Sequence, residues 1–185
     1  MGTRPNFVKV APIARALSAR PEAPPVHIVH TGQHYDPTMS DVFLDELAIP
    51  APTVNLGVGS GAQGAQTAAL LAAYEAHLLS VERPRGVVVV GDSNSTVACA
   101  LAAAKLGVPV AHVEAGLRSF DPAMPEEINR RVTDVLADLL LVSEPSGEEN
   151  LRREGAPEGR VRFTGNVMID TLVHELARAQ SLGLA

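Results

Sequence analysis

The chain has 185 residues, which is enough for one ordinary domain with a well-buried core. Hydrophobic residues make up 46% of it and charged residues 19%, a balance that is typical of a folded protein and excludes a disordered one. The formal net charge of −6 and the aromatic content of 3% argue against a nucleic-acid partner, because such proteins present basic surfaces and stacking rings.

The single cysteine, Cys99, lies in an apolar stretch and has no second cysteine with which to form a disulfide. We interpret it as a buried structural thiol, which fits a reducing compartment and predicts a cytoplasmic protein. The sequence has no run of about 18 apolar residues, so it predicts no transmembrane helix and no membrane partner.

Predicted strands and helices alternate along the chain. It begins with Met1–Pro5, which we interpret as a strand-to-helix loop with Pro5 near the first helical turn. Because nothing precedes this loop, we expect the central first strand of the sheet to be missing. Periodicity then predicts strands at 26–31, 53–56, 87–90, 110–113, 139–143 and 161–164, and helices at 39–47, 65–81, 95–106, 126–137, 146–154 and 169–179.

The order of these elements indicates the fold class. Short runs of Val and Leu are typical of parallel strands that are buried on both faces, and helices separate them here. The sequence therefore predicts an α/β fold with a doubly wound, Rossmann-like parallel sheet. We expect residues 1–185 to form one such domain, with strand 87–90 buried.

Acidic side chains gather where the predicted strands end. Asp92 follows strand 87–90, and Glu114 follows strand 110–113. Open α/β sheets bind ligands at the carboxyl ends of their strands, so these carboxylates are expected at one edge of the sheet. Glu126 and Glu127 open the next predicted helix, where acidic residues also favour the helix dipole. Three carboxylate positions at one crevice favour proton-transfer chemistry over packing.

Structural interpretations of the same residues stay open. Asp92 can cap the helix that follows it, as Asp, Ser and Asn commonly do. Glu114 at the end of a buried strand needs a partner, and Arg118 or Arg130 can pair with it. The sequence lacks the Cys/His spacing of metal sites, a nucleophile elbow, a phosphate loop and a dinucleotide fingerprint, so we expect no metal and no cofactor.

Two further groups are candidates for substrate binding. Arg4 and Lys9 lie near the N-terminus of the first predicted helix, where a guanidinium and helix amides suit phosphate oxygens, although solvated cations are the alternative. The segment His30–Asp36 lies at the end of the predicted strand 26–31 and contains many hydrogen-bonding side chains. A polar turn does not account for Gln33 and His34 crowded beside another histidine, so we predict a binding role.

Six motifs occur in order over nearly the whole chain: GTRP, HTGQHYD, GDSNST, HVEAGLRS, MPEEINR and FTGNVMIDTL. Together they resemble the non-hydrolysing UDP-N-acetylglucosamine 2-epimerases. The resemblance implies one half of a two-domain architecture of the glycogen-phosphorylase and glycosyltransferase type, with the active site between two Rossmann-like domains. It implies that this chain is the N-terminal domain and that the C-terminal nucleotide-binding domain is missing.

The activity that the resemblance implies is the interconversion of UDP-GlcNAc and UDP-ManNAc, by elimination of UDP and its re-addition with protonation at C2 from the other face. The full-length form is expected to be a bacterial homodimer that supplies precursors for envelope polysaccharide. The catalytic residues implied are Asp92, Glu114 and Glu126, and the predicted substrate-binding residues are Arg4, Lys9, Gln33, His34 and Arg118.

The sequence departs from the family at Asn6, where many members have Glu. Two alternative functions stay open. One is a hydrolysing 2-epimerase that releases ManNAc and UDP, and the other is a non-catalytic half-domain for dimerisation or sugar-nucleotide binding. Because the second domain is expected to be missing, we predict that the isolated chain is inactive.

Overall fold

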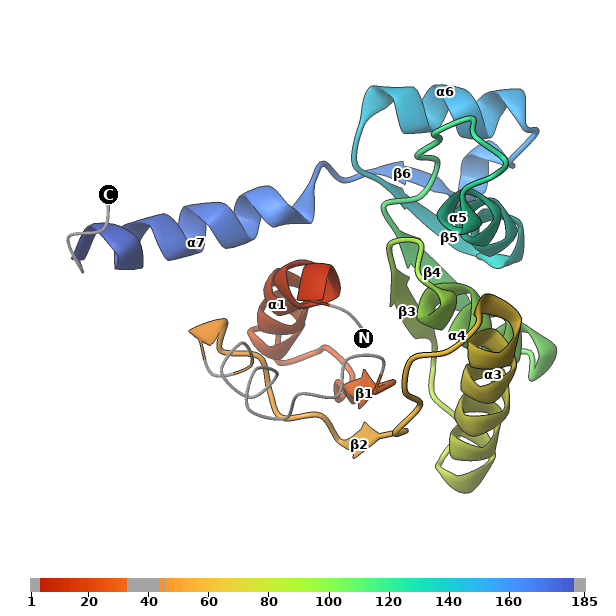
Figure 1. The fold of residues 1–185 in the computed structure, drawn as a ribbon. Helices are drawn as coiled ribbons and strands as arrows, with labels where there is room; N and C mark the ends of the chain where they lie inside the picture. The colour runs from red at the N-terminus through yellow and green to blue at the C-terminus, as the bar shows by residue number, and fades with distance from the viewer. Residues whose placement is uncertain (1–3, 33–43, 45, 182–185) are drawn as a thin grey trace.

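The computed structural model describes residues 4–32, 44 and 46–181, and its elements follow the predicted order (Figure 1). The helices are α1 (Arg4–Ser18), α3 (Gln63–Ser80), α4 (Asn94–Lys105), α5 (Pro125–Leu136), α6 (Pro145–Arg153), the 3-10 turn η1 (Glu158–Arg160) and α7 (Val167–Ser181). The strands are β1 (Val29–His30), β2 (Val54–Asn55), β3 (Val87–Val90), β4 (Val110–Val113), β5 (Leu139–Val142) and β6 (Val161–Phe163). The helix predicted at 39–47 lies mostly outside the described residues.

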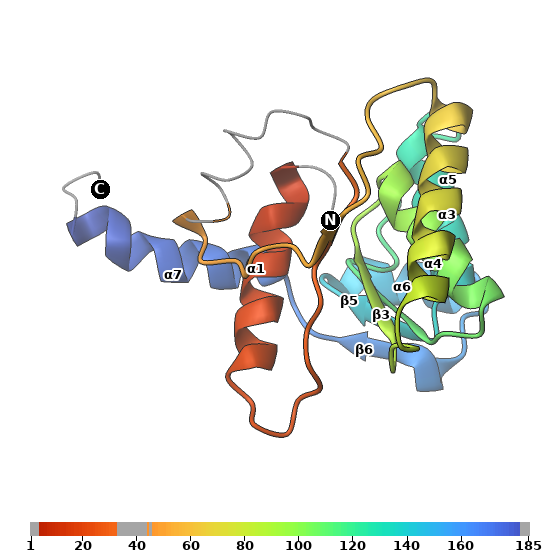
Figure 2. The same cartoon turned by 90° about the horizontal axis from the view of Figure 1, so that it is seen from below.

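The strands form two sheets, and every pairing in them is parallel. β1 pairs with β2 in the smaller sheet, and β3, β4, β5 and β6 lie in that order in the larger one. Crossovers between parallel strands are right-handed, so α4 and α5 fall on the same face of the larger sheet. Figures 1 and 2 show α3 beside them on that face, with α1 and α7 on the other side. The predicted α/β, Rossmann-like parallel fold is confirmed.

The larger core lies between this sheet and helices α3 and α4. α4 packs closely because its buried side chains are small, and Ala100, Ala102 and Ala103 are fully enclosed. Cys99 lies in the same core, where burial raises the pKa of its thiol to about 11. The prediction of a buried cysteine is confirmed.

Strand β3 is less completely buried than the sequence predicted. Val87 and Val89 point into the core beneath α3 and α4, but Val88 is 49% exposed. Successive side chains of a strand point to opposite faces of the sheet, so Val88 projects from the face that α3 and α4 do not cover. The expectation of a strand buried throughout is therefore wrong at this one position.

A second, smaller core joins α1 to the segments around β1. Phe7, Ala11 and Ala14 on one side of α1 pack against Ile28 and against Ile49. Helix α7 lies against α1, and the hydroxyl of its Thr171 donates a hydrogen bond of 2.6 Å to the Val8 carbonyl. Among the residues that the structure describes, no helix is both long and apolar enough to cross a membrane.

Candidate active site

Asp92 and Glu114 leave the larger sheet at the same edge. β3 and β4 are parallel with Val90 opposite Val113, so the residues just after them are neighbours in space. Glu114 has a φ of 69°, in the left-handed region that residues other than glycine seldom adopt. Such backbone costs about 1–3 kcal/mol and persists where the surrounding structure holds it, commonly at functional sites.

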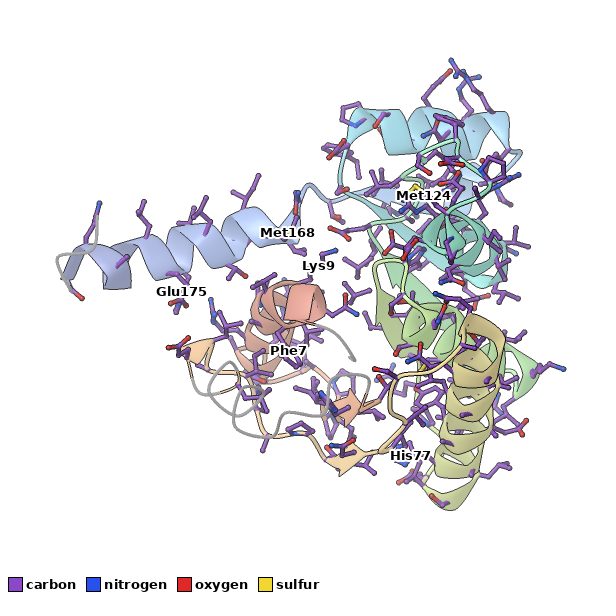
Figure 3. All side chains as sticks on the ribbon, viewed as in Figure 1. Phe7, Lys9, His77, Met124, Met168 and Glu175 are labelled. Atoms are coloured by element: carbon purple, nitrogen blue, oxygen red, sulfur yellow. The ribbon has the colours of Figure 1, made fainter. Side chains whose placement is uncertain are left out.

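The Glu114 side chain is 8% exposed, and its Oε2 pairs with the Nζ of Lys9. Lys9 projects from α1 (Figure 3). The two groups approach at Gly91, where an added Cβ would lie 3.4 Å from Asn6 Oδ1, 3.5 Å from Lys9 Nζ and 3.7 Å from Glu114 Oε2. The pairing of Glu114 with Arg118 or Arg130, which the sequence left open, is wrong, because the cation comes from α1.

Asp92 is 40% exposed, and its Oδ2 pairs with a guanidinium nitrogen of Arg130 on α5. The side-chain amide of Asn129, also on α5, donates a hydrogen bond of 3.0 Å to the backbone carbonyl of Asp92. Asp92 does not cap α4, since the N-cap is Ser93, whose hydroxyl accepts from the Thr96 amide. The capping interpretation is therefore wrong, and the Asp92 carboxylate faces Arg130 and solvent.

The two acidic residues at the start of α5 have different surroundings. Glu127 is buried, and its Oε2 accepts hydrogen bonds of 2.9 Å and 3.0 Å from the Ser119 amide and hydroxyl. Burial raises the pKa of Glu127, but these bonds and the charge of Arg130 outweigh it and hold the pKa below its usual range. Glu126 is half-buried and makes no side-chain hydrogen bond or ion pair with any described residue. Glu127 is therefore structural, whereas none of the residues described by the structure binds the Glu126 carboxylate.

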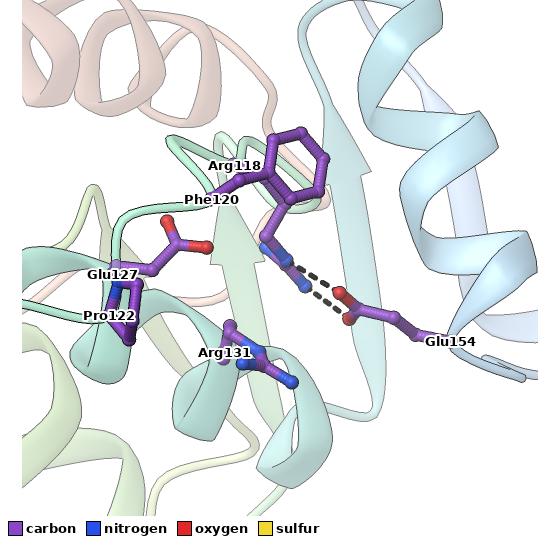
Figure 4. A pocket seen from close by; sticks show the side chains of 6 residues that line it. All are labelled: Arg118, Phe120, Pro122, Glu127, Arg131 and Glu154. Carbon is purple, nitrogen blue, oxygen red and sulfur yellow. Dashed lines mark hydrogen bonds and ion pairs between the residues drawn. The ribbon is translucent and has the colours of Figure 1, made fainter.

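Arg118 lies in a network of buried charges. Its side chain is 1% exposed, with one nitrogen 2.7 Å from Asp134 Oδ2 and two others donating to Glu154 at 2.8 Å and 2.6 Å (Figure 4). Burial lowers the pKa of Arg118, but the hydrogen bonds and negative charges of Glu154 and Asp134 outweigh burial and leave the pKa above its ordinary value. This placement favours a structural role, and the predicted contact with substrate stays a prediction.

The other predicted substrate-binding residues are only partly described. Arg4 begins α1, whereas the sequence placed Arg4 and Pro5 in the preceding loop, and the Arg4 side chain is not among those that the structure describes. Gln33 and His34 lie outside the described residues. Lys9 is thus the one member of this group that the structure brings to the carboxylates.

A hollow of about 230 Å³ lies beside Arg118 (Figure 4). None of the three predicted catalytic carboxylates lines it, so the hollow does not coincide with the candidate catalytic residues. Within the described ranges, no group of three or more His, Cys, Asp and Glu side chains is placed to hold a metal ion. The hollow is lined by Arg118, Phe120, Pro122, Glu127, Arg131 and Glu154.

Sequence reasoning missed two residues behind the carboxylates. His112 on β4 is 0% exposed, and its ring nitrogens contact Asp134 Oδ1 at 2.7 Å and the Gly91 carbonyl at 2.8 Å. The available signal was a histidine inside an otherwise apolar strand, Val110–Val113. Asp134 lies on α5 and gave no signal of its own.

The assembled site can move protons and hold an anion. Asp92 and Glu114 are carboxylates at one edge of the sheet, each beside a cation from a different helix. Carboxylates transfer protons, and lysine and arginine can bind phosphate oxygens or neutralise developing negative charge. The arrangement fits acid–base chemistry on an anionic substrate.

Comparison with known proteins agrees with this chemistry. A family model described as UDP-N-acetylglucosamine 2-epimerase matches residues 15–183. A relative of that name from Methanocaldococcus jannaschii is 46% identical over 182 residues, which are 97% of this chain and 48% of the relative. A relative from Pseudomonas aeruginosa, named UDP-2,3-diacetamido-2,3-dideoxy-D-glucuronate 2-epimerase, is 43% identical over 188 residues, 100% of this chain and 52% of the relative. The chain spans about half the length of these curated relatives.

Two solved structures share the fold closely. The crystal structure of Methanocaldococcus jannaschii UDP-GlcNAc 2-epimerase in complex with UDP-GlcNAc and UDP gives a TM-score of 0.92 at 46% identity, and the match covers 97% of this chain and 49% of that one. The Neisseria meningitidis UDP-GlcNAc 2-epimerase bound to UDP-GlcNAc gives a TM-score of 0.89 at 30% identity, over 99% of this chain and 50% of that one.

Proposed function

The chain belongs to the UDP-N-acetylglucosamine 2-epimerase family, and on that premise we propose that it supplies the acid–base residues of an enzyme that interconverts UDP-GlcNAc and UDP-ManNAc. The observation that carries the proposal is the pair of carboxylates, Asp92 and Glu114, that β3 and β4 bring to one edge beside Lys9 and Arg130. We propose further that the chain is the N-terminal domain of a two-domain protein.

The proposed reaction begins with elimination of UDP. A carboxylate takes the proton from C2 of the sugar, the electron pair of that C–H bond forms a C1–C2 double bond, and the C1–O bond breaks with its electrons leaving on the diphosphate. UDP then adds back at C1 while C2 is protonated from the opposite face. Two proton-transfer groups are therefore needed, together with cations for the departing diphosphate. Asp92, Glu114 and Glu126 are proposed for the first task.

Lys9 is involved both in proton transfer and in binding of the departing diphosphate. In the structure its ammonium pairs with Glu114, which keeps that buried carboxylate compensated. A diphosphate beside α1 competes for the same ammonium, so substrate binding would draw Lys9 from Glu114 and leave the carboxylate a stronger proton acceptor. Lys9 would then bind the leaving group, with Arg4 as a second proposed phosphate contact.

The test uses the protein extended to the full length of its relatives. UDP-ManNAc should form from UDP-GlcNAc, and solvent deuterium should enter C2 when the reaction runs in D₂O. Asp92→Asn, Glu114→Gln and Glu126→Gln should each lower turnover by about 100-fold or more, the usual scale for a positioned acid or base. The exposed α6 residue Glu148 provides the control, because Glu148→Gln should leave turnover unchanged. Retention of the original C2 hydrogen would rule out elimination.

A different UDP-sugar is one specific alternative to UDP-GlcNAc as the substrate. The Pseudomonas aeruginosa relative carries the name of a 2-epimerase for a UDP-diacetamido-glucuronate, and inversion at C2 needs the same two proton-transfer groups there. Both UDP-sugars should therefore be assayed side by side, with chromatography of the products. Free ManNAc with UDP would instead indicate the hydrolysing reaction. The 185-residue chain alone should form no detectable product, because positioning of the diphosphate contributes much of the rate.

The remaining proposals concern the oligomeric state, the cellular location and the biosynthetic role of the enzyme. We propose a homodimer, supported by an exposed apolar stripe on α5 formed by Ile128, Val132 and Val135. Sedimentation of the full-length protein should give twice the monomer mass. We also propose a cytoplasmic place in precursor supply for envelope polysaccharide, supported by the free, buried Cys99 and by the nucleotide-sugar chemistry.

A further inference from the structure

His112 is a buried polar residue that the proposed chemistry does not use. It lies on β4 two residues before Glu114, with a side chain that is 0% exposed. Its Nδ1 lies 2.7 Å from Asp134 Oδ1 and its Nε2 lies 2.8 Å from the Gly91 carbonyl oxygen. Both ring nitrogens therefore face oxygen atoms, and the question is which of them carries hydrogen.

Each ring nitrogen of His112 has a different partner. The Gly91 carbonyl can only accept, so Nε2 donates to it. Nδ1 faces Oδ1 of Asp134, and the other oxygen of that side chain, Oδ2, accepts from the Gly116 amide at 3.1 Å and lies 2.7 Å from Arg118.

The oxygen atoms of Asp134 are held from several sides. Asp134 contacts both His112 and Arg118, and Arg118 is in turn paired with the partly exposed Glu154. The His112 ring therefore lies between a backbone carbonyl and a side chain that is itself fixed in place.

The ring connects the two turns that carry the proposed catalytic carboxylates. Gly91, with a φ of 71°, directly precedes Asp92, and its carbonyl accepts the hydrogen bond from the ring. On the other side, Asp134 holds the amide of Gly116, which has a φ of 80° and lies two residues after Glu114. Both left-handed turns are therefore fastened to the same side chain and its partner.

We propose that His112 is a positioning residue that sets the distance and orientation between Asp92 and Glu114. This role rests on the proposed function, because it matters only if those carboxylates transfer protons to and from the sugar. The link to Gly91 is its essential part, because it holds the carbonyl of the residue directly before Asp92, and the amide of that same residue is bonded to the Val113 carbonyl. The link to Asp134 serves mainly to orient the ring.

Two substitutions separate the two links. The amide nitrogen of glutamine reaches the place of Nε2, and that of asparagine the place of Nδ1. His112→Gln therefore keeps a donor for the Gly91 carbonyl, whereas His112→Asn keeps one for Asp134. In the full-length protein we expect kcat to fall about tenfold in the glutamine variant and a hundredfold or more in the asparagine variant, with KM for UDP-GlcNAc unchanged in both.

A control separates positioning from folding. Both variants lose one buried hydrogen bond, so both should unfold at similar urea concentrations, and a merely structural role would lower the two kcat values together. Equal kcat values in the two variants, or a kcat that follows the urea midpoint, would overturn the proposal. An inactive wild type would instead overturn the proposed function, and the catalytic role of His112 with it.

A measurement on the 185-residue chain tests the geometry without activity. Long-range ¹H–¹⁵N spectra should show that Nε2 of His112 carries hydrogen, as its bond to the Gly91 carbonyl requires. The amide resonances of Gly91 and Asp92 should move in His112→Asn and stay in His112→Gln. An Nε2 without hydrogen, or movement at Gly91 in both variants, would contradict the assignment.

Discussion

The two regions of the molecule differ in how tightly they are packed. The region of β3–β6 with α3–α6 has four-stranded pairing and a core in which Leu140, Val142 and Leu151 are at most 1% exposed. The region of α1, α7, β1 and β2 has a smaller core, and its sheet pairs only two residues of each strand. The candidate site uses both, because its carboxylates come from the tightly packed region and Lys9 comes from the other.

The two regions contribute different properties to the site: one fixes the positions of the carboxylates, and the other supplies the charge that compensates Glu114. Asp92 and Glu114 are fastened to strands, to α5 and to the His112 network, so their positions depend on the tightly packed region. The compensation of Glu114 depends on the docking of α1, which rests on α7 and on the smaller core around β1. Changes in the first region should therefore damage the fold and the carboxylate positions together, whereas changes in the second should alter the charge first.

The largest effect is expected where two turns of the tightly packed region meet. Gly116 has a φ of 80°, and a Cβ there would collide with the carbonyl of Gly147. Gly116→Ala should therefore lower the free energy of unfolding by about 4 kcal/mol, through both backbone strain and the collision. Gly155 is the matched control, with a φ of 81° and nothing within 4 Å of its Cβ position. Gly155→Ala should cost about 1–2 kcal/mol in urea unfolding, and equal losses in the two variants would show that the close approach carries no energy.

Removal of the cation that α1 supplies is expected to have the next largest effect. Lys9→Met leaves the Glu114 carboxylate buried without its partner, and breaking a buried pair costs about 3 kcal/mol. The double variant Lys9→Met/Glu114→Gln removes the stranded charge as well, so it should recover at least half of that loss. Urea unfolding of the three proteins measures both steps. A double variant less stable than Lys9→Met would contradict the view that the unpaired charge causes the loss.

Hydrogen exchange should show the difference in packing directly. Amides of β4 and β5 lie in the larger sheet and should exchange only when the whole chain unfolds, whereas those of β1 and β2 should exchange through local opening. We expect protection at least about 100-fold lower in the smaller sheet, which corresponds to about 2.7 kcal/mol. The comparison uses one sample and needs no variant. Equal protection in the two sheets would mean that they unfold as one unit.

The sequence predicted the tightly packed region well for a physical reason. β3 is a run of valines between two glycines, and β4 follows Pro109 and is apolar except for His112. Both were predicted with their observed bounds, Val87–Val90 and Val110–Val113. β1 was predicted at 26–31 but spans only Val29–His30, the two residues that pair with β2. Apolar composition marks a segment that is buried, but the length of a strand also depends on its neighbour.

The candidate site was predicted as residue types but not as pairs. Strand ends placed Asp92 and Glu114 at one edge, and helix chemistry placed Glu126 and Glu127 together. The partner of Glu114 is 105 residues away in the chain, so no local pattern points to it. The left-handed backbone of Glu114 and the double hydrogen bonding of His112 are likewise products of tertiary packing, and neither changes the sequence pattern around it.

The smallest expected effect concerns Glu127, which ties α5 to the turn at Ser119 within the tightly packed region. Because its pKa in the folded protein lies below the usual value, its stabilising contribution is fully present above the pKa of the unfolded chain, near 4.5, and is lost as the pH falls through the folded value. Glu127→Gln should therefore be less stable than wild type by about 1 kcal/mol at neutral pH, and this difference should shrink as the solution is acidified below about pH 5. Urea unfolding over that range measures it, with Glu22→Gln, at an exposed residue outside the helices, as a control whose difference from wild type stays near zero at every pH. A gap between wild type and Glu127→Gln that widens on acidification would mean that the hydrogen bonds of Ser119 do not favour the ionised carboxylate, and the structural role assigned to Glu127 would then fail.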